Sequence, residues 1–248
     1  MPQLPGLSTV AGGLRIMYVG LCAIVIAVLA LTLLPAISLD LVMQLGGPER
    51  FVKTCFFTVL AGQILHLIGQ LLCLAVPRET GAAPALYLSI IPALLGMGLH
   101  FLLLFAPDLL LKIFPISWFI GLRLFYIQLA CFTFAICLLL LSLRTLNHYV
   151  GAARDASRAN TAFWATLVFV GLFVAFIVTS FQQPPLGRVP GGPRENNELV
   201  LGFSLATLLF GMVWLILYGN TLLYTSKALR AYERRGGQPE SRPEVVDD

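Results

Sequence analysis

The chain has 248 residues, of which 58% are hydrophobic and only 11% are charged, and its mean hydropathy is +0.87. A soluble domain carries roughly 25% charged residues, so this composition excludes a protein that covers itself with a polar surface. The formal net charge is +4. The basic residues are not interleaved with aromatic side chains, however, so the chain gives no support for nucleic-acid binding.

The first long apolar segment covers about residues 15–35 and follows a single basic residue, Arg15. It is longer than the apolar core of an ordinary signal peptide and lacks a clear small-residue cleavage motif. The sequence therefore predicts an uncleaved first membrane span, with residues 1–14 as a short cytoplasmic segment ahead of it.

Five more apolar segments follow, and each reaches the roughly 20 residues that a helix needs to cross a bilayer. Proline-containing turns and a Pro/Gly-rich stretch near 182–198 separate several of them. Such long apolar runs lack the alternation of barrel strands, and helices satisfy their own backbone groups in lipid. The sequence therefore predicts an all-α, polytopic membrane protein, a bundle of six transmembrane helices at about 15–35, 51–76, 84–105, 116–143, 160–181 and 198–226.

The distribution of Lys and Arg predicts the orientation, because cytoplasmic loops carry an excess of these residues. Ten of the sixteen lie on the side of the two termini and five on the other side, while Arg123 lies within the fourth span. Both termini are therefore expected in the cytoplasm, and the protein in the cytoplasmic (plasma) membrane. The tail, 227–248, is basic at first, which suits an anionic leaflet, and then acidic, and we expect it to be disordered.

The second span contains the polar stretch GQILHLIGQ, residues 62–70. At 100° per residue, Gln63, His66 and Gln70 lie within about 60° of one another around a helix. This periodicity predicts an inner face, which also carries Cys55, Val59, Gly62, Gly69 and Cys73. The opposite face is expected to meet lipid through Phe57, Leu60, Ile64, Ile68 and Leu71.

Other spans also have faces of small or polar residues, which allow close helix approach and interhelical hydrogen bonds of roughly 0.5–2 kcal/mol each. The third span places His100 on such a face, the fourth places Arg123 beside Tyr126, and the fifth offers Gly171 and Ala175. The sixth span has a continuous stripe formed by Ser204, Thr207, Gly211, Trp214, Tyr218, Thr221 and Thr225.

The six candidate site residues, as interhelical hydrogen-bonding groups or as the lining of a cavity, are Gln63, His66, Gln70, His100, Arg123 and Tyr126. Two interpretations of Arg123 stay open, since its side chain either faces the bundle or snorkels to the outer interface. If it faces inward, only Asp108 and Glu49 are plausible counter-charges.

The sequence predicts no metal site and no cofactor. The inferred heights of His66 and His100 differ by roughly 9 Å, too much for one metal at about 2 Å from each nitrogen. Shared haem ligation would need a kink or a shift of about two turns. The cysteines lie in apolar runs without ligand spacing, as buried hydrophobes do; they are Cys22, Cys55, Cys73, Cys131 and Cys137.

Catalytic motifs are absent from the sequence: it has no intramembrane carboxylate pair, no HExxH, no Walker-type loop and no Gly-x-Ser-x-Gly. This favours a non-enzymatic structural, partner-binding or sensor component, surrounded by the lipid bilayer. A protein partner would bind through the outer loops or the C-terminal tail.

Two alternatives remain open. One is a transporter or channel with an outward-opening cavity for a small anionic or zwitterionic solute. The other is a haem or quinone redox module that uses His66 or His100. A dry interior with His66 bonded to a neighbouring helix favours a packing role, whereas a continuous polar cavity favours transport.

Overall fold

The computed structural model describes residues 6–37, 39–44, 46–105, 119–181 and 195–238. Within these ranges all regular structure is helical, and six helices are long and apolar enough to cross a membrane. The expected fold class is therefore confirmed. The helices are α1 (Leu7–Ile37), α2 (Leu39–Gln44), α3 (Gly47–Cys73), the 3-10 helix η1 (Arg78–Thr80), α4 (Ala83–Phe105), α6 (Phe119–Tyr149), α7 (Ala153–Phe181) and α8 (Glu195–Arg234).

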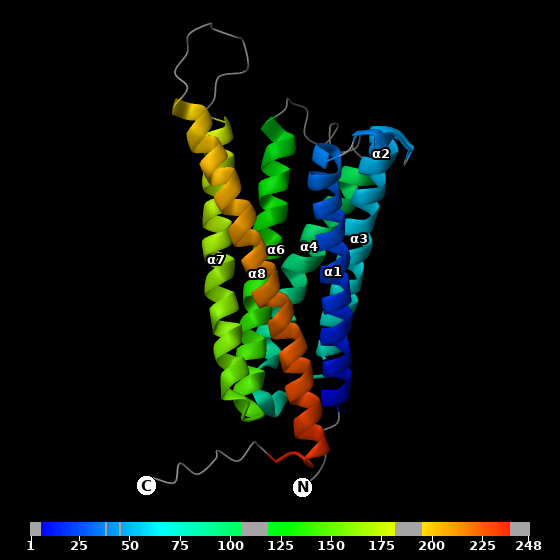
Figure 1. The fold of residues 1–248 in the computed structure, drawn as a ribbon. Helices are drawn as coiled ribbons and strands as arrows, with labels where there is room; N and C mark the ends of the chain where they lie inside the picture. The colour runs from blue at the N-terminus through cyan, green and yellow to red at the C-terminus, as the bar shows by residue number, and fades with distance from the viewer. Residues whose placement is uncertain (1–5, 38, 45, 106–118, 182–194, 239–248) are drawn as a thin grey trace, which may run out of the picture.

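The six long helices form a closed ring in which each packs against the next, in the order α1, α3, α4, α6, α7 and α8, and α8 returns to α1. Their axes run up and down the bundle, and both termini lie at its lower end (Figure 1). We call this the terminal end. That it faces the cytoplasm stays a prediction from the Lys and Arg count.

Several helices extend beyond the spans expected from hydropathy. Helix α1 begins at Leu7 rather than near 15, α7 at Ala153 rather than near 160, and α8 continues to Arg234 rather than 226. The first turns of α1 are buried, with Leu7 and Leu14 at most 2% exposed. Hydropathy marks the apolar part of a helix, whereas backbone hydrogen bonding continues into its polar ends. Part of the expected N-terminal segment thus belongs to the bundle.

Helix α3 begins at a sharp change of chain direction. Gly46 and Gly47 have φ angles of 101° and 85°, which glycine adopts without the steric cost that a Cβ would impose. Pro48 then occupies the first turn of the helix, where its missing N–H breaks no helical hydrogen bond.

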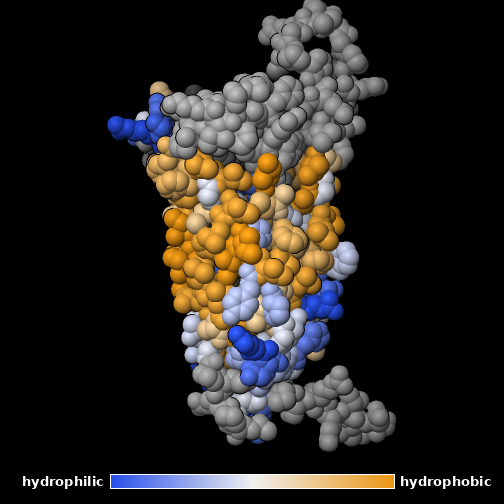
Figure 2. All heavy atoms as spheres, turned by 180° about the vertical axis from the view of Figure 1, so that it is seen from behind, coloured by the Kyte–Doolittle hydropathy of each residue, from blue (hydrophilic) through white to orange (hydrophobic). Residues whose placement is uncertain are grey.

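An apolar belt surrounds the described part of the molecule. Figure 2 shows hydrophobic residues across the middle of one face and more hydrophilic residues toward the terminal end. Large side chains such as Ile26 (65% exposed), Leu95 and Trp164 point outward. Such an extent of exposed apolar surface is unusual for a soluble monomer and is what lipid chains solvate.

Two pairs of glycines bring α1 and α3 into backbone contact. A Cβ added to Gly13 would lie 2.5 Å from the carbonyl oxygen of Gly69, and one added to Gly69 would lie 2.5 Å from that of Gly13. The same relation joins Gly20 and Gly62, at 2.5 and 2.7 Å. The residues of each helix are seven apart, so they repeat on one face. Gly62 and Gly69 were expected to face inward, which this contact confirms.

The expected packing face of the fifth span is wrong for Gly171. This residue is exposed, and a Cβ placed on it would meet nothing within 4 Å. Helix α7 packs instead through a row of small residues spaced three apart, Ala156, Ala159, Ala162 and Ala165. Small residues occur on two faces of this helix, and only the contacts with α6 and α8 show which face packs.

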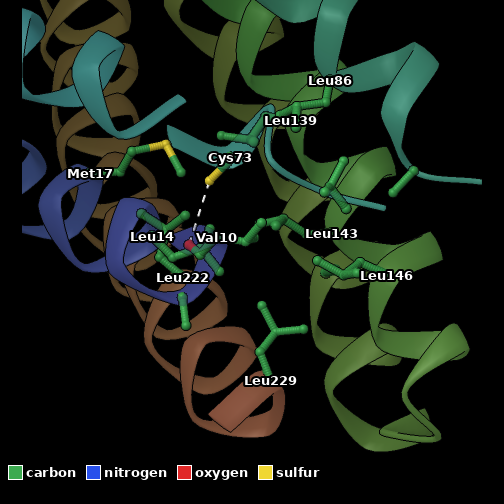
Figure 3. Close-up of a cluster of buried hydrophobic side chains, with 14 of the residues drawn as sticks. Val10, Leu14, Met17, Cys73, Leu86, Leu139, Leu143, Leu146, Leu222 and Leu229 are labelled. Atoms are coloured by element: carbon green, nitrogen blue, oxygen red, sulfur yellow. Dashed lines mark hydrogen bonds between the residues drawn. The ribbon is translucent and has the colours of Figure 1, made fainter. Parts of the chain in front are cut away.

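The interior near the terminal end is filled by a leucine-rich cluster, which we call the apolar plug (Figure 3). It joins all six long helices, and Cys73 Sγ donates across it to the carbonyl oxygen of Val10 at 3.7 Å. Seven of its large side chains have an exposed fraction of 0%: Leu14, Met17, Leu139, Leu140, Tyr218, Leu222 and Leu229. The interior near the terminal end is therefore largely apolar, with a few hydrogen-bonded polar side chains such as Asn147 and Ser226.

Candidate functional site: polar side chains inside the bundle

The polar face of α3 points into the bundle, as the periodicity predicts. Gln70 is fully buried, and Gln63 and His66 are half-buried. On the opposite side, Phe57 and Leu71 are exposed by 49% and 47%. Leu60 is the exception to the expected lipid face, because it is only 7% exposed and lies against α4. The exact boundary of the buried face depends on where α4 packs, which periodicity does not specify.

His66 joins α3 to α8 through the interior. Its Nε2 lies 2.6 Å from the hydroxyl oxygen of Tyr218, a side chain with no exposed surface. The Tyr218 ring stacks on Trp214, which stacks in turn on Phe169 of α7 at 4.9 Å between ring centroids. The indole N–H of Trp214 donates to Thr166 Oγ1 at 2.8 Å. A continuous set of contacts thus connects α3, α8 and α7.

His100 joins a second set of helices, α3, α4 and α6. Its Nδ1 lies 2.9 Å from Gln128 Nε2 and 3.4 Å from Gln63 Nε2. Amide nitrogens only donate hydrogen bonds, so Nδ1 acts as the acceptor and the ring proton resides on Nε2. The second nitrogen therefore offers an N–H donor, and it is buried without a partner in the described part of the chain.

His66 of α3 and His100 of α4 lie level with different turns of α3. The His100 ring is 6.3 Å from the ring of Phe56 and bonds to Gln63, whereas His66 lies one turn further toward the terminal end. They also bond to different partners. The described residues contain no group of three or more His, Cys, Asp or Glu that could hold a metal ion.

Several buried polar atoms have no hydrogen-bond partner among the described residues. They are Gln63 Oε1, both side-chain atoms of Gln70, His100 Nε2 and Asn147 Oδ1. An unsatisfied buried donor or acceptor costs about 1–3 kcal/mol, and native proteins contain few of them. Three of these residues lie on or against the inner face of α3, so the unmet hydrogen-bonding capacity is concentrated there.

Two expected site residues, Arg123 and Tyr126, have side chains outside the described residues, although α6 includes their backbone. Whether the Arg123 side chain faces the bundle or snorkels to the outer interface therefore stays a prediction. Sequence reasoning missed Gln128, Asn147 and Thr166. Gln128 carried a usable signal, an amide inside an apolar run, but it lies about 140° around the helix from Arg123 and so was not grouped with it.

A double-mutant cycle measures the bond between α3 and α8. We expect Tyr218→Phe and His66→Leu to show a coupling energy of roughly 0.6–1.7 kcal/mol, the range found for hydrogen bonds between membrane helices. The measurement is the free energy of unfolding in detergent, followed by tryptophan fluorescence. Tyr224→Phe is the control, since the Tyr224 ring contacts Arg158 through its face; it should not couple to His66→Leu. Equal coupling for both tyrosines would contradict the assignment.

No protein-family model matches this chain, and no curated protein and no solved structure does so either. The function is therefore inferred from the geometry of the chain's own residues.

Proposed function

We propose that the protein binds an uncharged, hydrogen-bonding molecule inside its six-helix bundle, as a solute transporter or a membrane sensor does, without catalysing a reaction. The observation that carries this proposal is Gln70, whose amide is fully buried with neither polar atom bonded to a described residue. Gln63 Oε1 and His100 Nε2 add an acceptor and a donor on the same side of α3. A bound molecule that bonds to these atoms removes their desolvation cost.

An uncharged ligand suits this interior better than the anionic or zwitterionic solute considered from sequence. Among the side chains that the structure describes, the buried polar ones are all neutral types or histidine, and no Asp, Glu, Lys or Arg is buried. A charge placed among the described side chains would meet no buried counter-charge there and would pay a large desolvation cost. Neutral amides and imidazole instead match hydroxyl, carbonyl and amide groups.

The apolar plug limits where such a molecule enters. Leucine side chains with no exposed surface fill much of the interior near the terminal end. Entry from that end would require these helices to separate. The plug thus favours a site that opens away from the termini.

A structural role is the competing function, and the bond between His66 and Tyr218 favours it. In that case the polar side chains only hold helices together and the interior is dry. Replacing Gln70 separates the two functions. In a dry interior Gln70→Leu removes an unsatisfied amide and should stabilise the fold by about 1–3 kcal/mol, whereas in a liganded interior it removes a binding group.

The experiment compares wild type with Gln70→Leu in detergent, with glycerol, acetamide and 1-butanol as probes. We expect at least one probe to raise the unfolding temperature of wild type saturably, and Gln70→Leu to abolish this rise. Ser89→Ala is the matched control, because the equally buried Ser89 hydroxyl donates to Leu86 O at 2.7 Å and needs no ligand. A more stable Gln70→Leu protein, with no response in wild type, would establish the structural role instead.

A further inference from the structure

A groove opens on the lipid-facing side between α3 and α4. It has a volume of about 280 Å³, close to the roughly 300 Å³ at which small-molecule sites begin. It is lined by Leu60, Ile64, Leu94, Met97, Gly98 and Phe101. All six residues are apolar, and the interface between α3 and α4 is the least extensive of the six in the helical ring. The size and the apolar lining of the groove therefore suit an alkyl chain.

Two of the unpartnered polar atoms belong to residues on the same helix pair as this groove, although neither residue lines it. In sequence, Gln63 falls between the groove residues Leu60 and Ile64, and His100 falls between Met97 and Phe101. The two polar side chains contact each other across the same helix pair, at 3.4 Å. His100 is only 6% exposed, and its Nε2 has no partner among the described residues. The interface between α3 and α4 is thus apolar on its lipid side and polar on its inner side.

We propose that this groove admits a single-chain amphiphile from the bilayer, with its alkyl chain in the groove and an uncharged hydroxyl head group at Gln63 and His100. The inference rests on the proposed function and names its ligand class.

The hydroxyl group matches both unpartnered atoms at once. Gln63 Oε1 accepts a hydrogen bond, and His100 Nε2 carries the proton and donates one. A hydroxyl donates through its hydrogen and accepts through its lone pairs, so one group carries the complement of each atom. An alkane offers neither interaction. A carboxylate would bring a charge that no buried Lys or Arg among the described side chains compensates.

Gly98 provides a variant that fills the groove without disturbing the fold. It is exposed, and a Cβ added to it would meet nothing within 4 Å. Gly98→Leu therefore places a side chain in the groove and leaves the helix contacts intact. Gly171→Leu is the matched control. Gly171 of α7 is also exposed, a Cβ added to it would also meet nothing within 4 Å, and it lies outside the groove.

The experiment measures equilibrium binding of radiolabelled 1-decanol to the protein in lipid nanodiscs. We expect saturable binding of one molecule per chain, with decane and decanoate at least tenfold weaker as competitors. Gly98→Leu should weaken 1-decanol binding at least tenfold, and Gly171→Leu should leave it unchanged. Binding that does not saturate, that decane displaces equally well, or that Gly98→Leu retains would overturn the inference.

Failure of this inference is distinguishable from failure of the proposed function. If 1-decanol shows no specific binding while the response to glycerol, acetamide or 1-butanol still depends on Gln70, the interior binds a molecule that does not enter through the groove. If the Gln70-dependent response is also absent, the interior site itself is refuted and both proposals fall.

Discussion

Gly13→Leu is expected to separate α1 from α3 and to cost about 3 kcal/mol or more of folding free energy. Its Cβ would lie 2.5 Å from the carbonyl oxygen of Gly69 and 3.0 Å from Cys73 Sγ. The nearest obstacle is a backbone atom, which moves only if the helix moves. Overpacking a tight contact usually costs about 1–3 kcal/mol, and more when the backbone must shift. The measurement is unfolding in detergent, followed by tryptophan fluorescence.

The adjacent residue provides the control. Gly12 lies in the same turn of α1, but a Cβ added to it would meet nothing within 4 Å. Gly12→Leu removes the same flexible residue from the same helix and adds the same side chain. We expect it to leave stability unchanged or to raise it slightly, because leucine has a higher helix propensity than glycine. If the two leucine variants were equally unstable, the close approach of α1 and α3 would not be the cause.

This glycine contact illustrates what a sequence pattern predicts and what it leaves undetermined. Gly62 and Gly69 were assigned to the inner face of the second span because they share it with Gln63 and Gln70. Their partners on α1 were not anticipated, although Gly13 and Gly20 have the same spacing of seven. Periodicity assigns a residue to a face of its own helix, but it does not identify the helix that covers that face.

The fold class was predictable because lipid imposes one strong condition. Every backbone group must be satisfied within a span, so length and hydropathy alone point to helices. The inner position of His100 on α4 followed from helix periodicity, and this side chain is buried. The error at Gly171 has a different origin. Small residues on α7 occur on more than one face. A glycine that faces lipid costs little folding free energy, so its presence does not mark a packing face.

The pairing of polar residues was not predictable from sequence. His66 lies on α3 and Tyr218 on α8, 152 residues apart in the chain. Both were assigned to inward faces, yet their contact depends on the relative heights and rotations of two helices that are not neighbours in the ring. Gln128 shows the same difficulty, since its contact with His100 is set by how α6 packs on α4.

Leu139→Ala is expected to destabilise the apolar plug by about 2–3 kcal/mol. Leu139 is fully buried within the cluster that closes the terminal end. Leucine-to-alanine changes in protein cores cost about 2–5 kcal/mol, which combines lost transfer energy with a cavity. In a bilayer the surroundings are themselves hydrocarbon, so helix association gains little from transfer, and the cavity dominates. The lower part of that range is therefore expected, measured as the free energy of unfolding.

Leu141→Ala tests whether the cost comes from the cavity rather than from the change of residue. Leu141 lies two positions further along α6 and is 36% exposed, so an acyl chain or detergent tail can occupy the space that its side chain vacates. We expect a loss below about 0.5 kcal/mol, as for surface substitutions in general. Equal losses at the two positions would mean that the plug is no denser than the surrounding lipid, and the polar interior above it would then lack a closed end.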